Sequence, residues 1–242
     1  NVGPEDRRVM AFDLESWRLN DSTPEGTGKT EMDAPEGMCV TEGKMYVVDT
    51  ANSRIVAFDT STLKKAGQYP PVHWVNSPVC RIPKHMQLDN PQDIAAHEGE
   101  LFVSDTHNDR IQVFTTGLEH IGTIGQKGKG PGQFQYPRGV CIARSGSRAP
   151  ALLYVAEQTR IQALTLLGEP RIISMIPNAV NLCGICSDGV RVYVTDMDGH
   201  RIHVLRLTHG ERWQEVRREA IEEARARKAW RDGNKKGGGG GG

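Results

Sequence analysis

The sequence has no excess of charge of either sign and no long hydrophobic run. Its 242 residues include 30 Lys and Arg and 30 Asp and Glu, which gives a formal net charge of +0. No overall electrostatic field therefore draws the chain to nucleic acid or to an anionic membrane, so such binding would need a local patch. No apolar run approaches the roughly 18 residues of a membrane span, and no apolar signal core follows the N-terminus. The sequence predicts no membrane insertion.

Motifs for catalysis, cofactors and metals are also scarce. No Ser-His-Asp order, nucleophile elbow or pair of carboxylates stands out, and His107, His200 and His203 lie in separate segments. The five cysteines include one Cys-x-x-Cys, Cys183 and Cys186, without the second pair that a zinc site needs. We therefore expect no catalytic residue, no cofactor and no metal. An odd number of cysteines favours a reducing intracellular compartment.

What the sequence does contain is a repeat. The stretch YVVDTANSRIVAF at 46–58 returns as FVSDTHNDRIQVF at 102–114, in shortened form as YVAEQTRIQAL at 154–164, and as YVTDMDGHRIHVL at 193–205. A short apolar run precedes each copy and in three cases opens with proline, which suits the entrance of a strand. Each unit is therefore predicted to contain three strands. Repeats a few tens of residues apart indicate units that stack on their neighbours.

Three cysteines share one place in the first strand of the repeat. Cys39, Cys141 and Cys186 occupy it in three copies, and Ala95 occupies it in the fourth. A small apolar residue suits a tightly packed position, so we interpret this place as a packing slot. The alternative is a ring of thiols that binds metal or senses oxidation, but it lacks the nearby partners that four-coordinate zinc needs.

The phrase Asp-Thr-x-Asn-x-Arg lies between the second and third strands of the repeat. The aspartate can accept hydrogen bonds from the turn backbone, and the asparagine suits its left-handed positions. The arginine can reach back to the acid by a charge-assisted hydrogen bond. We interpret these residues as local bracing, with direct binding as the alternative; the shortened third copy has Glu157 in place of the aspartate. The residues are Asp49, Asn52, Arg54, Asp105, Asn108, Arg110, Arg160, Asp196 and Arg201.

This phrase, with the linker GQKGKGPGQFQYP at 125–137, resembles the NHL repeat. The likeness extends over most of the stretch from Arg8 to Leu207. It implies an all-β fold, a β-propeller of four-stranded blades arranged radially around a central channel. About four full blades and a partial one are expected. The ring has five blades if it closes, with a strand at 8–14 joining the last sheet; the alternative is an open fragment of a larger propeller.

The propeller is expected over residues 1–207, followed by a charged amphipathic helix over 208–232 and a flexible glycine-rich tail over 233–242. The helix is predicted by the capping-box spacing of Thr208 and Glu211 and by acids that come early and bases that come late. The chain begins at Asn1 inside a repeat, as expected of a fragment or a processed form. The propeller divides into a partial first blade at 1–33, repeats at about 34–71, 90–125, 136–176 and 181–207, and an insertion at 72–88.

The function that these patterns favour is a non-enzymatic protein-interaction scaffold, a fixed subunit of a larger assembly. Rigid sheets would give position, while loops, the insertion and the helix would give specificity. The candidate partner contacts are Trp74, His85, Lys127, Lys129, Arg138, Trp213 and Trp230.

Two other functions compete with the scaffold. Some animal members of the family bind single-stranded RNA through a basic propeller face, which Lys127, Lys129, Arg138, Arg144 and Arg148 could form here, although few aromatic residues are interleaved to stack on bases. Related repeats also occur in propeller lyases that hold zinc with residues from several blades. A metal-dependent lyase or hydrolase is therefore the second alternative, without a matching ligand cluster in this sequence.

Overall fold

The computed structural model describes residues 9–12, 14–16, 18–22, 32–71, 82–144 and 149–206. The predicted helix at 208–232 and tail at 233–242 lie outside these residues. So do Trp74, Trp213 and Trp230. Within the described part, no helix is long and apolar enough to cross a membrane.

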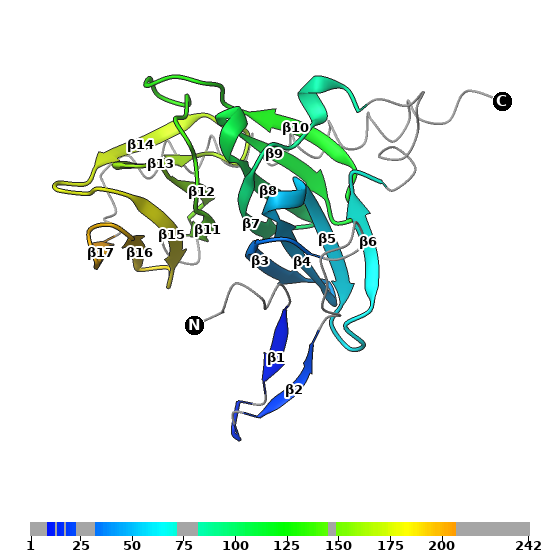
Figure 1. The fold of residues 1–242 in the computed structure, drawn as a ribbon. Helices are drawn as coiled ribbons and strands as arrows, with labels where there is room; N and C mark the ends of the chain where they lie inside the picture. Colours follow the sequence, from blue (N-terminus) through cyan, green and yellow to red (C-terminus); the bar gives the residue numbers. More distant parts are fainter. Residues whose placement is uncertain are drawn as a thin grey trace.

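Four antiparallel sheets follow one another along the chain and form an arc, with blade 1 in blue and cyan and blade 4 in yellow and orange (Figure 1). Blade 1 contains β3 (Pro35–Thr41), β4 (Lys44–Asp49), β5 (Arg54–Asp59) and β6 (Lys65–Tyr69). Blade 2 contains β7 (Pro91–His97), β8 (Glu100–Asp105), β9 (Arg110–Thr115) and β10 (His120–Ile124). Blade 3 contains β11 (Val140–Arg144), β12 (Ala151–Ala156), β13 (Arg160–Leu164) and β14 (Pro170–Met175). Blade 4 contains β15 (Leu182–Ser187), β16 (Arg191–Asp196) and β17 (Arg201–Arg206).

This architecture is a four-bladed β-propeller, which confirms the predicted all-β propeller of about four blades; the helix predicted to follow it is not tested, because it lies outside the described residues. Each sheet runs in sequence order, so every strand pairs with the next through a hairpin or short turn. Three sheets have four strands, and blade 4 has three among the described residues. Irregular elements are short: the 3₁₀ turns Thr50–Asn52 and Thr106–Asn108 connect the second and third strands of blades 1 and 2, and Lys84–Met86 precedes blade 2.

The N-terminal residues form a separate hairpin of β1 (Met10–Phe12) and β2 (Leu19–Ser22), which projects beyond blade 1 (Figure 1). The sequence suggested that a strand here would join the last sheet. In the structure β1 pairs with β2 instead. Val9, just before β1, packs against the outer side of blade 1.

The hydrophobic core lies between neighbouring blades. Three apolar clusters fill the three interfaces, and each joins the second and third strands of one blade to the first and second strands of the next. In blade 1, for example, Tyr46 and Ile55 pack with Ile94 and Leu101 of blade 2, and all four are buried. Successive side chains of a strand point to opposite faces of the sheet. The apolar residues of one strand can therefore pack against both neighbouring blades.

Hydroxyl groups add polar links between the blades. Thr50 Oγ1 donates a hydrogen bond to the carbonyl of Pro91 at 2.8 Å, and Thr106 Oγ1 donates one to the carbonyl of Pro137 at 2.7 Å. Both contacts are buried. In blades 1 and 2, the threonine that follows the turn aspartate therefore fixes the entrance of the next blade. In blade 4 the same place is taken by Met197, which is exposed.

Candidate functional site

The repeated turn residues contact one another within each blade. Arg54 Nε donates to Asp49 Oδ2 at 2.5 Å, and Asn52 Nδ2 donates to the same oxygen at 3.0 Å. Asp49 Oδ1 accepts from the amide of Asp33. Asp49 is fully buried, so these bonds compensate for the loss of water around its carboxylate. The arginine and the asparagine of this turn thus bond to its aspartate, and the bracing role of these residues stays a prediction.

The other three blades contain the same hydrogen bond between the arginine and the acid, but with different neighbouring residues. The arginine Nε lies 2.8 Å from the acid in blades 2 and 3 and 3.3 Å from it in blade 4. The shortened third copy keeps the interaction because Glu157 has one more methylene than aspartate and reaches Arg160 across the smaller turn. In blade 4 His203 also lies 3.1 Å from Asp196, and the amide of Asn181 donates to Asp196, which lowers its pKa. The acids and arginines are Asp105 with Arg110, Glu157 with Arg160, and Asp196 with Arg201; Asn108 also donates to Asp105.

A second group of residues lies where the first strands of the four blades meet. Glu36, Gln92, Arg138 and Cys183 occupy one repeat position, the second residue of the run that opens each blade. These four and the residue after each of them line a cavity of about 220 Å³. We call this cavity the channel mouth. From the sequence, Arg138 was predicted as a partner contact and Cys183 was noted in the Cys-x-x-Cys pair, but the four residues share no chemistry that would mark them as a set.

The channel mouth contains both acidic and basic groups. Arg138 Nη1 donates to Cys183 Sγ at 3.2 Å. Burial raises the pKa of Glu36, while the nearby charge of Arg138 acts against the rise. The site can therefore offer both charged donors and carboxylate acceptors to a small polar molecule.

Asp93 is the unusual residue of the channel mouth. The other three blades have glycine at its position, namely Gly37, Gly139 and Gly184. Its carboxylate accepts hydrogen bonds from the amides of Ile94 and Val140, and so joins blade 2 to blade 3. Burial raises the pKa of Asp93 to about 6, and the charge of Glu36 acts in the same direction. An alignment of the four opening runs would have revealed this aspartate.

The basic residues predicted to form one patch are partly engaged elsewhere. Lys127 lies 3.4 Å from Asp109, with its side chain 75% exposed. Arg144 pairs with Glu98 of blade 2 at 2.9 Å, and Arg138 lines the channel mouth. The carbonyl of Lys129 accepts from Arg160. Arg148 lies outside the described residues.

Part of the insertion at 72–88 is described, from residue 82 onward. His85 is exposed, and its carbonyl accepts a hydrogen bond from the buried Gln112 of β9 at 3.0 Å. Its ring lies edge-on to His120 at 6.4 Å. This end of the insertion is thus attached to the outer part of blade 2. In the described part of the chain, no three His, Cys, Asp or Glu side chains are grouped so that they could hold a metal ion.

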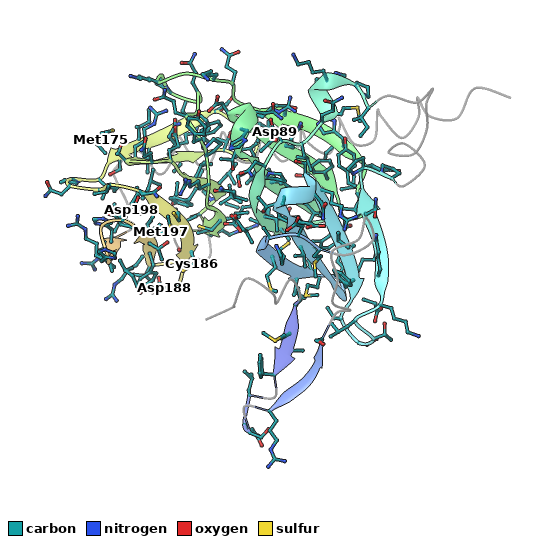
Figure 2. The ribbon with its side chains drawn as sticks, viewed as in Figure 1. Asp89, Met175, Cys186, Asp188, Met197 and Asp198 are labelled. Atoms are coloured by element: carbon teal, nitrogen blue, oxygen red, sulfur yellow. The ribbon has the colours of Figure 1, made fainter. Side chains whose placement is uncertain are left out.

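Blade 4 exposes a third candidate surface. Its side away from blade 3 carries Cys186 on β15, Tyr193 and Thr195 on β16, and Ile202 and Val204 on β17. The strand register places these residues opposite one another, so they share a face, which we call the free face. Figure 2 labels Cys186 and Met197 in blade 4 and Met175 at the end of β14 in blade 3, on the side of the arc away from blade 1.

Comparison with known proteins agrees with the architecture. The family model of the NHL repeat matches residues 88–114, which contain β7, β8 and most of β9. The chain is thus a β-propeller protein. The NHL model matches the first three strands of blade 2, and the resemblance to the NHL repeat seen in the sequence is confirmed there. No curated protein matches the chain.

Several solved structures share the fold at low sequence identity. Catalytically inactive virginiamycin B lyase from Staphylococcus aureus with Quinupristin has a TM-score of 0.55 and 16% identity, over 84% of this chain and 64% of that one. BamB from Moraxella catarrhalis has a TM-score of 0.53 and 13% identity, over 85% and 53%. BBS1N in complex with ARL6DN has a TM-score of 0.56 and 10% identity, over 85% and 60%. The match therefore spans less than two thirds of each of these proteins.

Proposed function

We propose that this protein is a non-enzymatic protein-interaction scaffold that serves as a fixed subunit of a larger assembly. The observation that carries the proposal is the distribution of exposed apolar side chains. Nine of the fourteen exposed large hydrophobic residues in the described part of the chain lie between 167 and 204, on blades 3 and 4. Exposed apolar surface gathered on one part of a protein is typical of a protein-binding site.

The similar structures are consistent with this function. BBS1N is a propeller seen in complex with another protein, ARL6DN. One propeller scaffold supports many activities, so such likeness is an analogy at the level of the fold. We further propose that the insertion at 72–88 and the helix predicted at 208–232 contribute partner contacts, with Trp74, Trp213 and Trp230 as apolar anchors.

RNA binding is the second candidate, and it rests on the exposed side chain of Lys127. The engagement of Arg138 and Arg144 by other residues of the chain favours the scaffold over it. A metal-dependent lyase or hydrolase in the channel is the third candidate, by analogy with virginiamycin B lyase. It would require a bound metal.

The test is a gentle affinity purification of the tagged chain from its native source. Protein, RNA and metal are quantified in the same eluate at low and moderate salt. We expect stoichiometric protein partners and neither RNA nor metal in stoichiometric amount. RNA that is lost steeply as salt rises would establish RNA binding instead. The Lys127→Glu/Lys129→Glu variant serves as the control, since it should lower RNA recovery only if the basic loop binds RNA.

A further inference from the structure

The free face of blade 4 can be compared position by position with the equivalent face of the other blades. Ile202 is the counterpart of Ile55, Ile111 and Ile161 in the third strand of the repeat. Those three are 0%, 0% and 5% exposed, whereas Ile202 is 64% exposed. Each of the three buried residues is covered by the following blade. Ile202 is thus an interface residue of the repeat without a following blade in the described structure.

The other positions of the free face give the same result. Val204 is 56% exposed, while its counterparts Ala57, Val113 and Ala163 are buried. Cys186 is exposed, while Cys39 and Cys141 pack against the neighbouring blade at the same place. The free face therefore has the same residue pattern as the faces of blades 1, 2 and 3 that pack against the following blade. What covers each of those faces is a β-sheet with aliphatic residues on its first and second strands, such as Ile94 and Leu101.

We infer that the free face of blade 4 is the docking site for a β-sheet of a partner protein, a sheet that packs on it as one propeller blade packs on the next. The inference rests on the proposed scaffold function and identifies its partner surface. Packing two aliphatic faces together removes apolar area from water, which is the main driving force of such association.

Two features of blade 4 specify the partner sheet further. Arg191 and Arg206 lie opposite each other in the register of β16 and β17, and like charges at opposed positions repel. Asp188 interacts with Arg191, but no described carboxylate pairs with Arg206. The partner sheet therefore carries an acidic residue beside Arg206. Met197 stands where blades 1 and 2 have the threonine that bonds to the next blade. At this position the partner sheet therefore contacts Met197 with an apolar side chain.

A second copy of the chain fits this surface less well. The face of blade 1 that would meet it head to tail is already covered in part: Met45 and Val47 are buried in a cluster with Met32 and Val9. Met38 and Val40 of the first strand stay exposed there. A second copy could therefore offer only β3 of blade 1 to the free face, because the cluster around Met32 covers the rest of that side. A sheet from another protein is not covered in this way.

The test places the photo-crosslinking residue benzoylphenylalanine at Val204 in the tagged chain, expressed in the organism of origin. The matched control carries it at Val40 of β3, which is 63% exposed but lies on blade 1, outside the exposed apolar residues of blades 3 and 4. We expect crosslinks from 204, and not from 40, to a partner peptide that alternates apolar and polar residues and has an acidic residue close by. Crosslinks to residues 1–33 or 207–242 of the same chain, or to a second copy, overturn the inference.

A substitution experiment separates this inference from the proposed function. Ile202→Ser/Val204→Ser should reduce the affinity for the crosslinked partner about a hundredfold, because two apolar side chains no longer leave water on binding. Val40→Ser, on β3 of blade 1, should leave the affinity unchanged. In the wild-type assembly Cys186 should also react with maleimide far more slowly than in the isolated chain. Equal partner recovery by the double variant overturns only the inference, whereas a wild-type chain that recovers no protein overturns the proposed function.

Discussion

At the scale of single residues, Asp93 is the group whose chemistry depends most on the fold. In an unfolded chain its carboxyl would have the ordinary aspartate pKa of about 3.9. Between the first strands of blades 2 and 3, burial raises that pKa to about 6 although two backbone amides donate to the carboxylate. The folded chain therefore holds the proton of Asp93 more tightly than the unfolded chain does.

The sign of the resulting pH dependence follows from this difference. The contribution of Asp93 to the free energy of unfolding is fully present below about pH 4 and is lost as the pH rises through about 6. Relative to Asp93→Asn, the wild-type chain should thus lose roughly 1–3 kcal/mol between pH 4 and pH 7. Urea denaturation of both chains across this range measures the difference.

Asp59→Asn is the matched control with the opposite sign. Hydrogen bonds from Ser61 and Thr62 lower the pKa of Asp59, so its contribution is present at neutral pH and is lost as the pH falls through the lowered value. A difference between wild type and Asp93→Asn that is constant with pH, or that follows the direction of Asp59, would contradict the assignment for Asp93.

At the scale of strands and turns, the repeat was informative because its residues act locally. Tyr46 and Val48 alternate along one strand, and the arginine of the turn bonds to an acid five residues away, so both features are visible in a short stretch of sequence. The channel mouth was not visible in this way. Glu36 and Cys183 line the same cavity only because the first strands of the four blades converge there. The sequence contains no information on the distance between residues of separate blades.

The threonine hydroxyls between blades give a prediction for an element. Thr106→Val keeps the shape of the side chain but removes the hydroxyl that donates to the buried carbonyl of Pro137. The carbonyl then loses its partner at a buried position, which should lower the free energy of unfolding by about 1–3 kcal/mol. Thr60→Val is the control, because the hydroxyl of Thr60 donates to Gly43 at an exposed position and its loss should cost less than about 0.5 kcal/mol. Equal losses in denaturation experiments would show that the link between blades does not contribute.

At the scale of the whole molecule, the blades form a linear stack in which each contacts its sequence neighbours. Blades 2 and 3 are covered on both sides by apolar clusters. Blade 4 has one such cluster and a free face, and blade 1 is covered on its outer side by a smaller cluster that includes Met32. In a stacked repeat protein, stability is roughly a sum of the units and of the interfaces between neighbours. Stability should therefore be lowest at blade 4.

Hydrogen–deuterium exchange of the isolated chain measures this gradient. Amides of β16 and β17 should exchange at least about tenfold faster than amides of β8 and β9, because opening blade 4 breaks one interface and opening blade 2 breaks two. Strands β12 and β13 provide the internal control, since blade 3 is also flanked on both sides and should exchange like blade 2. If β17 exchanged as slowly as β9 in the isolated chain, the free face would already be covered in solution, and blade 4 would not be the open end of the stack. Slower exchange of β17 in the assembly than in the isolated chain would place the missing interface on this blade.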